Sequence, residues 1–333
     1  MKKMILVSIM VLTIFVSINL SGITGSSSTD KLITITAAYL EQEGTSQDLA
    51  YKKFKEYVEE KSNNRVRVQL YPNGQMGGER KTVEAVSLGT LTISETITSV
   101  LTTYSSDFEV LDLPFIFSDK DSGFRALDGK LGARFDNLLL ERGFRNLGYG
   151  YSGARSMSNN VRPIYEPNDV KGLKMRVMET PVYIDFFKTL GANPVPISFD
   201  ELFIALQQGT VDGEENPPTL FYSSKFYEVQ KYYSLTEHTY GYLANLINES
   251  FYQSLPEDIR TIIDDGAKKY LVDWQRQEEV NQNIDILKKL EAEGLIINEI
   301  SPDNRQKFFN AMAPLYDKYK KKLGEEIFDL VVQ

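Results

Sequence analysis

The spacing of apolar and polar residues predicts strands and helices that alternate along most of the chain. Residues 32–38 alternate and are rich in β-branched side chains, as in a strand, whereas residues 46–60 have the apolar spacing of an amphipathic helix. The same criteria predict strands at 65–70, 91–94 and 144–151 and helices at 78–88 and 121–142. This alternation is typical of an α/β architecture.

The second half of the chain continues this pattern and adds one unusually long helical segment. A helical pattern runs from 257 to 293, longer than a typical globular helix, and Gly266 is a candidate break within it. Capping boxes are predicted where helices begin, at residues 198–201 and 254–257. The remaining elements are predicted as strands at 174–178, 193–196 and 295–300, helices ending at 190 and spanning 302–323, and apolar runs at 232–235 and 242–247.

One arginine is of special interest because it lies inside an otherwise apolar strand, Lys174-Met-Arg-Val-Met178. The guanidinium of this residue, Arg176, can bind a carboxylate through two parallel, charge-assisted hydrogen bonds. Open α/β sheets bind ligands near the carboxyl ends of their strands. A solvated strand arginine is the alternative, which these residues alone leave open. The position of Arg176 therefore favours a protein that captures small organic anions.

Composition and charge exclude several classes of protein. The 333 residues are 42% hydrophobic and 25% charged, which is ordinary for a globular protein of one large or two medium domains. The net charge of -9 argues against nucleic-acid binding, so an anion site has to be a local positive pocket. The absence of cysteine excludes disulfides, a thiol nucleophile and a lipidated cysteine anchor.

The first 29 residues have the features of a secretory signal. Lys2 and Lys3 precede an apolar stretch at 4–18, and small residues follow at 21–28. The apolar stretch is shorter than the roughly 20 residues of a membrane span. The usual small-x-small cleavage pattern is missing, so an uncleaved anchor is the alternative. In both cases we expect the protein outside the cytoplasm, in the periplasm or at the outer face of the cell membrane.

The residues needed for catalysis or for a metal centre are sparse. His238 is the only histidine, and no Gly-x-Ser-x-Gly sequence supplies a nucleophile for it. Neither a histidine and cysteine cluster for zinc nor EF-hand spacing for calcium is present, although a carboxylate calcium site without that spacing stays open. We therefore expect no enzyme activity, no cofactor and no metal site, and a structural role for His238.

Six motifs occur in the order and spacing of one known family. They are Tyr71-Pro-Asn-Gly-Gln-Met-Gly-Gly-Glu-Arg80, Leu111-Asp-Leu-Pro-Phe115, Asp169-Val-Lys-Gly-Leu-Lys-Met-Arg-Val177, Gly191-Ala-Asn-Pro-Val-Pro196, Phe199-Asp-Glu-Leu-Phe-Ile-Ala-Leu-Gln207 and Val211-Asp-Gly-Glu-Glu-Asn-Pro217. Each is weak by itself. Together they make the chain, from about 32 to 324, resemble the extracytoplasmic solute-binding subunit of tripartite ATP-independent periplasmic (TRAP) transporters.

The resemblance implies a periplasmic-binding-protein-like α/β fold of two lobes, with crossing strands, a long bracing helix and the ligand in the cleft between the lobes. We expect lobe I to comprise 30–152 and about 237–265, and lobe II to comprise 153–236 and about 266–333 with the lobe-bridging helix. In this family the lobes close over the ligand by a hinge. The resemblance also implies ion-gradient-driven uptake, with integral-membrane TRAP permease subunits as partners. We expect the protein itself to be a monomer.

The resemblance transfers five ligand-binding positions to this chain, namely Arg176 for the ligand carboxylate, Arg155, Asn216, Phe199 and Glu79. Phe199 also fits a core position in the first turn of its helix, and Glu79 also fits a purely structural role at a helix start. Thr96 and Glu95 complete the predicted set, because they follow a strand of lobe I and are expected to face the cleft.

Departures from the family pattern bear on the predicted ligand. The family usually has glutamine at the position of Glu214, and often aspartate at that of Thr92. Sialate-binding members have an acidic residue near Ile97, so sialate is a less favoured ligand. We expect a sugar acid such as a hexuronate, with a four-carbon dicarboxylate as the alternative if Arg155 binds a second carboxylate. A membrane-anchored sensory binding protein with the same ligand is the alternative function.

Overall fold

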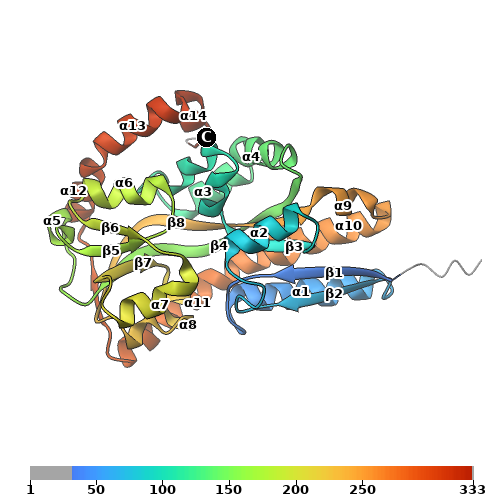
Figure 1. Cartoon of the computed structure of the whole chain (residues 1–333), viewed down its shortest axis with the longest axis horizontal. Coiled ribbons are helices and arrows are strands. Elements are labelled where there is room, and N and C mark those ends of the chain that lie inside the picture. Colours follow the sequence, from blue (N-terminus) through green and yellow to red (C-terminus); the bar gives the residue numbers. More distant parts are fainter. Residues whose placement is uncertain (1–31, 332–333) are drawn as a thin grey trace, which may run out of the picture. The chain divides into compact units, whose positions relative to one another are not determined.

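A single mixed β-sheet forms the frame of the protein (Figure 1). The computed structural model describes residues 32–331, and within this range the strand order is β2-β1-β3-β8-β4-β7-β5-β6, with β9 paired to β8. The strands are β1 (Ile33–Ala38), β2 (Val66–Tyr71), β3 (Ile93–Ile97), β4 (Phe144–Asn159), β5 (Lys174–Val177), β6 (Asn193–Pro196), β7 (Gly213–Asn216), β8 (Tyr232–Asn248) and β9 (Ile296–Glu299). The α/β class predicted from the alternating pattern is confirmed.

Helices connect most of these strands. The α-helices are α1 (Ser46–Lys61), α2 (Glu79–Ser87), α3 (Lys120–Leu127), α4 (Lys130–Leu140), α5 (Pro167–Val170), α6 (Pro181–Thr189), α7 (Phe199–Gln207), α8 (Pro218–Ser223), α9 (Glu249–Ser254), α10 (Glu257–Gly266), α11 (Gln275–Ala292), α12 (Pro302–Ala311), α13 (Ala313–Leu323) and α14 (Glu325–Val331). Shorter 3-10 helices occupy Thr98–Thr103, Ser106–Asp112 and Phe226–Glu228, and a π-helical segment occupies Ala267–Trp274. Among residues 32–331, none of the helices is both long and apolar enough to cross a membrane.

Two long antiparallel strands, β4 and β8, run through the middle of the sheet. They join the half that contains β1, β2 and β3 to the half that contains β5, β6 and β7; these halves are called the two sides below. On one side β1 is parallel to β2 and β3, and on the other side β5 is parallel to β6 and β7. The sequence predicted only half of β4 and two separate apolar runs within β8. It missed the polar middle of β8, where Thr239 pairs with Arg155, because β4 supplies backbone partners that an apolar pattern does not reveal. A shift of register near Arg155 and a φ of 42° at Glu237 mark a bulge there.

A continuous helix runs from α10 through the π-helical segment into α11, as the pattern from 257 to 293 predicts. Gly266 does not break it, since its φ of -64° and ψ of -43° are helical. A Cβ atom at this position would lie 2.9 Å from Cδ1 of Tyr57 and 3.3 Å from Cδ2 of Phe54, both on α1. Glycine is therefore needed here for the close approach of α10 to α1, and the helix does not break at this candidate position.

Three local predictions were wrong in detail. The helix predicted at 121–142 is two helices, because Gly129, with φ -111° and ψ -144°, leaves the helical conformation between α3 and α4. Ser198 occupies the N-cap of α7, but its hydroxyl makes no capping bond. The Ser254 hydroxyl donates to the Phe251 carbonyl oxygen at 2.6 Å instead of capping α10. The two capping sequences thus indicated where α7 and α10 begin, but the predicted side-chain capping hydrogen bonds are not formed.

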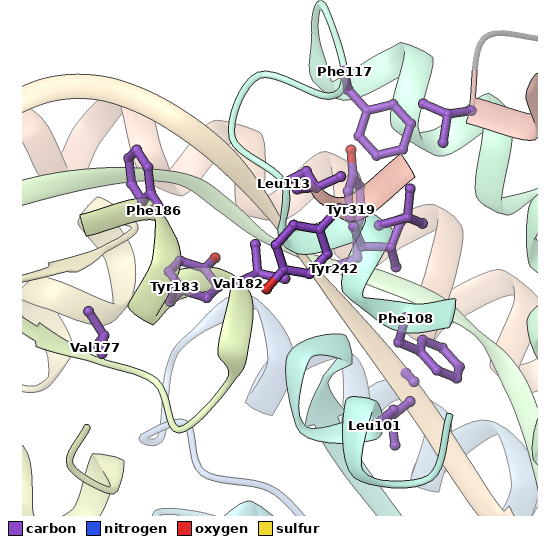
Figure 2. Close-up of a cluster of buried hydrophobic side chains, with 14 of the residues drawn as sticks. Leu101, Phe108, Leu113, Phe117, Val177, Val182, Tyr183, Phe186, Tyr242 and Tyr319 are labelled. Atoms are coloured by element: carbon purple, nitrogen blue, oxygen red, sulfur yellow. The ribbon is translucent and has the colours of Figure 1, made fainter. Parts of the chain in front are cut away.

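Apolar side chains from both sides of the sheet meet in one buried cluster that includes Tyr242 of β8 (Figure 2). Leu101 and Phe108 join it from the chain between β3 and α3, and Val177 and Phe186 join it from β5 and α6. Two further clusters lie around α1, α10 and β2 and around α7, β8 and β9. Because burial of apolar surface is the dominant stabilising contribution, the shared cluster couples the stability of the two sides.

One sheet and one apolar cluster contain residues of both predicted lobes, so neither marks a boundary between them. The boundaries of lobes I and II therefore stay a prediction. The predicted signal or anchor at 1–29 lies outside the described residues. The outer ends of two predicted lobe segments, 30–152 and 266–333, also fall partly outside them.

We predict that Gly266→Val lowers the free energy of unfolding by about 1–3 kcal/mol, because the larger side chain overpacks the contact with α1. Valine has a higher helix propensity than glycine, so such a loss does not originate in the helix itself. Asp265→Val, at the adjacent exposed position, is the control and is expected to change stability by less than about 0.5 kcal/mol. Urea unfolding followed by circular dichroism measures both variants, and equal effects would contradict the close contact.

Candidate functional site

A cavity of about 350 Å³ lies beside the carboxyl ends of β1, β3, β5 and β7, where α/β sheets commonly bind ligands. Its lining comes from the chain after β1, from α2 and from the end of β3 on one side of the sheet, and from β5, α7 and α8 on the other. Five of the seven predicted site residues line it, namely Glu79, Arg155, Arg176, Phe199 and Asn216. Thr96 and Glu95 are buried and do not belong to the lining.

Arg176 is buried, with 2% of its surface exposed, and it has no carboxylate partner within residues 32–331. Its Nε atom donates to the Ile197 carbonyl oxygen at 2.8 Å, which orients the guanidinium. The residue lines the cavity, and its two Nη groups make no hydrogen bond with the described part of the chain. Burial lowers the pKa of Arg176 from its ordinary value. An anion in the cavity would supply the charge that this cation lacks.

Arg155, in contrast, is already neutralised by Glu215 of β7. Its Nε and Nη2 atoms donate to the two carboxylate oxygens at 2.6 and 2.8 Å, and Nη2 also donates to Oδ1 of Asn216 at 2.8 Å. Although burial works in the opposite direction, the Arg155 guanidinium lowers the pKa of Glu215 to about 2. Nε2 of His238 lies 3.2 Å from the same carboxylate, and Nδ1 lies 2.8 Å from the Thr236 hydroxyl oxygen. His238 therefore supports Glu215, which agrees with the structural role expected for it.

Asn216 lines the cavity, but both ends of its amide also bind other residues. Oδ1 accepts from Arg155, and Nδ2 donates one hydrogen to the Glu214 carboxylate, which leaves the second hydrogen for a ligand. Glu214 is fully buried and accepts from the Ser158 hydroxyl at 2.6 Å. Burial raises the pKa of Glu214 to about 7, so this carboxyl is partly protonated at neutral pH.

The lining on the side of β1 and β3 contains the carboxyl groups of Glu79 and Glu41 together with two exposed basic residues of α2, Arg80 and Lys81. Glu79 begins α2, and its Oε1 atom accepts from the Ile97 backbone N–H at 2.6 Å and from the Thr96 hydroxyl at 3.4 Å. Glu41, in the chain after β1, lines the same part of the cavity. Burial raises the pKa of Glu79 to about 7 and that of Glu41 to about 7. The cavity thus has the guanidinium groups of Arg176 and Arg155 on one side and carboxyl groups of variable charge on the other. Further charged residues of both signs also line it, namely Arg80, Lys81, Glu179, Asp200 and Glu201.

Apolar side chains complete the wall. Phe199, the first residue of α7, borders the cavity and also packs on Phe226 with ring centroids 5.8 Å apart, so it has both of the roles considered for it. Ile97, near which the family resemblance places an acidic residue in sialate-binding members, lines the cavity. Thr92 lies away from the lining, and its backbone N–H and its hydroxyl pair with the Thr36 hydroxyl at 3.0 and 3.2 Å. The departure at Thr92 therefore leaves the cavity wall unchanged.

Sequence reasoning missed several carboxyl groups of this site, and Glu41 and Glu215 are the two that bear most on its charge. Glu41 lies in an irregular segment without a motif, and only the fold brings it close to Glu79. Glu215 does lie in a motif, next to Asn216. Two consecutive glutamates in a buried strand need a cation nearby. They could therefore have indicated that a buried arginine, here Arg155, is paired with one of them.

The arrangement supports binding rather than a reaction. Residues 32–331 contain no group of three or more acidic or histidine side chains that could hold a metal ion. His238 is buried behind Glu215 and does not line the cavity. What the lining offers is a free guanidinium, hydrogen-bonding groups and an apolar wall, which is the composition of a specific small-molecule site.

Glu214→Gln is expected to stabilise the protein at pH 8 relative to the wild type. The folded protein raises the pKa of Glu214 from 4.5 to about 7, so the neutral form is favoured on folding and stability is lost as pH rises through 7. A glutamine does not ionise and so avoids this loss. Its amide can donate to the Ser158 hydroxyl, and the Ser158 hydroxyl can in turn donate to Oε1 of Gln230, 3.1 Å away. The gain over wild type should grow by about 2–3 kcal/mol between pH 5 and pH 8.

Urea unfolding at several pH values measures this difference for Glu214→Gln. Glu291→Gln, at an exposed position of α11, is the matched control and is expected to show no such trend. A gain for Glu214→Gln that does not change with pH would contradict the raised pKa.

Comparison with known proteins shows similarity over most of the chain. Residues 37–322 match the family described as bacterial extracellular solute-binding protein, family 7. A solute-binding protein of Verminephrobacter eiseniae is 35% identical over 309 residues, which are 92% of this chain and 90% of that protein. This extent of similarity includes every element that lines the cavity.

Solved structures agree with this result. The sugar acid binding protein DctPAm of Advenella mimigardefordensis, in complex with galactonate, has a TM-score of 0.88 and 31% identity over 91% of this chain and 97% of that one. A TRAP periplasmic solute binding protein of Sulfurospirillum deleyianum, with bound succinate, has a TM-score of 0.86 and 32% identity over 91% of this chain and 99% of that one. The predicted two-lobed periplasmic-binding fold is confirmed by these similarities. The predictions of a receptor rather than an enzyme, and of a location outside the cytoplasm, agree with the family. The chain belongs to family 7 of the bacterial extracellular solute-binding proteins, the solute receptors of TRAP transporters.

Proposed function

We propose that the protein captures a sugar acid, such as a hexuronate, and delivers it to the integral-membrane subunits of a TRAP transporter. The ligand carboxylate binds the two Nη groups of Arg176, and Asn216 donates its remaining amide hydrogen at the same end. Hydroxyl groups at the other end of the ligand donate to Glu79. The ligand leaves unchanged, because the cavity binds it without reacting with it.

The observation that supports a carboxylate ligand most directly is the unpaired charge of Arg176. A buried guanidinium with unused donors at a cavity is unfavourable until an anion binds it. A carboxylate matches the planar arrangement of its two Nη groups with two parallel hydrogen bonds. Because Arg155 is neutralised by Glu215, Arg176 provides the uncompensated positive charge at this end.

The acidic side of the lining favours a sugar acid over a four-carbon dicarboxylate. A second carboxylate would lie near Glu79 and Glu41, and like charges at close range repel each other. Of the basic residues on the same side, Arg80 is already paired with Glu179 and Lys81 is exposed to solvent. Arg155 offers little compensation, since Glu215 already accepts two of its hydrogen bonds. Relatives were solved with galactonate and with succinate, so family membership alone does not decide between these classes.

Closure of the lobes over the ligand requires contacts that can also be released. Arg80 of α2 and Glu179, which follows β5, form an ion pair at 3.2 Å between the two sides of the lining. Both side chains are nearly half exposed, so the pair contributes at most about 1 kcal/mol. A contact of this strength assists closure without preventing release of the ligand to the membrane subunits.

A thermal-shift screen of residues 30–333 against sugar acids, four-carbon dicarboxylates, keto acids and sialate tests this proposal. A ligand at 100 times its Kd adds about 2.7 kcal/mol to stability, which raises the Tm by several degrees. A shift with sugar acids is the expected result. A shift with dicarboxylates alone would replace the ligand class, and a flat screen of folded protein freed of carried-over ligand would contradict carboxylate binding.

Arg176→Ala is expected to weaken sugar acid binding by roughly 30-fold to several thousand-fold. The physical reason is the loss of a desolvated charge pair, which costs about 2–5 kcal/mol. Isothermal titration calorimetry with galacturonate measures the change. Arg67→Ala, which removes an exposed arginine from a strand of the same sheet, is the control and should leave binding unchanged. A loss of less than about threefold in Arg176→Ala would remove Arg176 from the binding site.

A further inference from the structure

Glu41 is an acidic residue of the cavity wall that none of the sequence motifs includes. It lies in the chain between β1 and α1, and it lines both the cavity and an adjoining pocket of about 280 Å³. Only 8% of the residue is exposed. A carboxyl group placed in this way faces a bound ligand rather than bulk water.

The segment that contains Glu41 is held firmly by its neighbours. Tyr39 stacks on Tyr51 of α1 with ring centroids 4.8 Å apart, and its hydroxyl donates to Asp48 at 2.9 Å. The Glu41 carbonyl oxygen accepts from the backbone N–H of Asn73 at 2.9 Å. These contacts on both sides of the segment give the Glu41 side chain a defined position at the cavity.

Glu95 of β3 is a neighbour of Glu41, and one of its two carboxyl oxygens has no hydrogen-bond donor in the described part of the chain. It is 3% exposed, and its Oε1 atom finds no donor among residues 32–331. Besides burial, the neighbouring Glu41 carboxyl raises the pKa of Glu95, both through its charge and as a hydrogen-bond acceptor. A buried carboxylate without a donor is strongly unfavourable, so Glu95 keeps its proton and donates it to Glu41 in a hydrogen bond. Glu95 thus positions Glu41 without reaching the cavity.

We propose that Glu41, positioned by Glu95, determines ligand specificity: it accepts hydroxyl hydrogens at the far end of a sugar acid and repels the second carboxylate of a dicarboxylate. This inference rests on the proposed function, because it places the ligand carboxylate on Arg176. From there the rest of the ligand extends toward the side of the lining formed by Glu41 and Glu79. An ionised acceptor strengthens hydrogen bonds from hydroxyl groups, whereas a second carboxylate has no hydrogen to donate.

The charge at this end of the cavity changes with pH. Burial raises the pKa of Glu41 to about 7, that of Glu79 to about 7 and that of Glu95 well above its usual range. Above pH 7, Glu41 and Glu79 are therefore mostly ionised, and near pH 6 they are mostly neutral. The other charged and titratable groups described around them include Tyr39 after β1, Asp48 and Tyr51 of α1, Arg80 and Lys81 of α2, Arg155 of β4, Arg176 of β5, Glu179 after β5, Asp200 and Glu201 of α7 and Glu279 of α11.

The test compares the Kd of succinate with the Kd of galacturonate by isothermal titration calorimetry at pH 8. Glu41→Gln keeps the size of the side chain and its hydrogen bond with Glu95 but removes the charge. We expect it to reduce the preference for galacturonate by about tenfold or more. Glu43→Gln, in the same segment with a side chain that is 74% exposed, is the matched control and should leave the ratio unchanged.

The same measurement at pH 6 separates the charge of Glu41 from its shape. The wild-type ratio should approach that of Glu41→Gln, because protonation then neutralises the wild-type carboxyl. At a given pH, succinate has the same protonation state in the measurements on the two proteins. Its own titration therefore cancels when the wild type is compared with Glu41→Gln at that pH.

Glu95→Gln tests the positioning role. Its amide donates to Glu41 in place of the protonated carboxyl, so the preference at pH 8 should persist. Glu95→Met lacks this donor and, because the hydrogen bond from Glu95 lowers the pKa of Glu41, should lose the preference at a higher pH than the wild type. A merely structural role for Glu95 would leave that pH unchanged.

The outcomes distinguish this inference from the proposed function. An unchanged ratio in Glu41→Gln, with both ligands still bound, overturns the inference and leaves the proposed function intact. Binding of neither ligand by the folded wild type overturns the proposed function and the inference together. If Glu41→Gln does not fold, Glu41→Asp, which withdraws the carboxyl from the ligand, replaces it in the same comparison with the wild type, and an unchanged ratio then overturns the inference.

Discussion

The site depends on the burial of one guanidinium that the protein itself leaves uncompensated. Removing a cation from water is costly, and proteins usually offset this cost with a paired carboxylate. Arg155 has such a partner in Glu215, whereas Arg176 has only the Ile197 carbonyl oxygen among residues 32–331. In a chain with a net charge of -9, this arrangement creates a local positive site. Because little water screens a charge in such surroundings, an anion that reaches Arg176 interacts with it strongly.

The central strands make this arrangement possible. Arg155 lies on β4, Glu215 on β7 and Arg176 on β5, so adjacent strands bring the paired and the unpaired arginine to the same cavity. The acidic residue Glu79 is bound to the end of β3, and β8, β4 and β7 lie between β3 and β5 in the sheet. The two ends of a ligand therefore contact different sides of the fold. Movement of these sides relative to each other would change both contacts at once, which couples ligand binding to closure.

The carboxyl groups of the site differ in charge because their neighbours differ. Glu214 and Glu215 are adjacent in sequence and both are fully buried, yet burial raises the pKa of Glu214 while Arg155 lowers that of Glu215. Glu41, Glu79 and Glu95 have no comparable cation, and burial raises the pKa of each. The Arg155–Glu215 pair is therefore ionised at neutral pH, whereas the charge of Glu41 and Glu79 changes near pH 7.

Local patterns in the sequence determined the α/β class, the strand that contains Arg176 and the long helix, because these features depend on neighbouring residues. The family resemblance carried by ordered motifs identified the family and five of the residues that line the cavity. Only the tertiary structure decided that Arg155 is neutralised, that Glu41 joins the site and that Gly266 allows close contact with α1. Arg155 and Glu215, for example, are 60 residues apart in the chain. The sequence thus determined which chemical groups are present, whereas long-range contacts decided which of them are compensated and which one is left to bind a ligand.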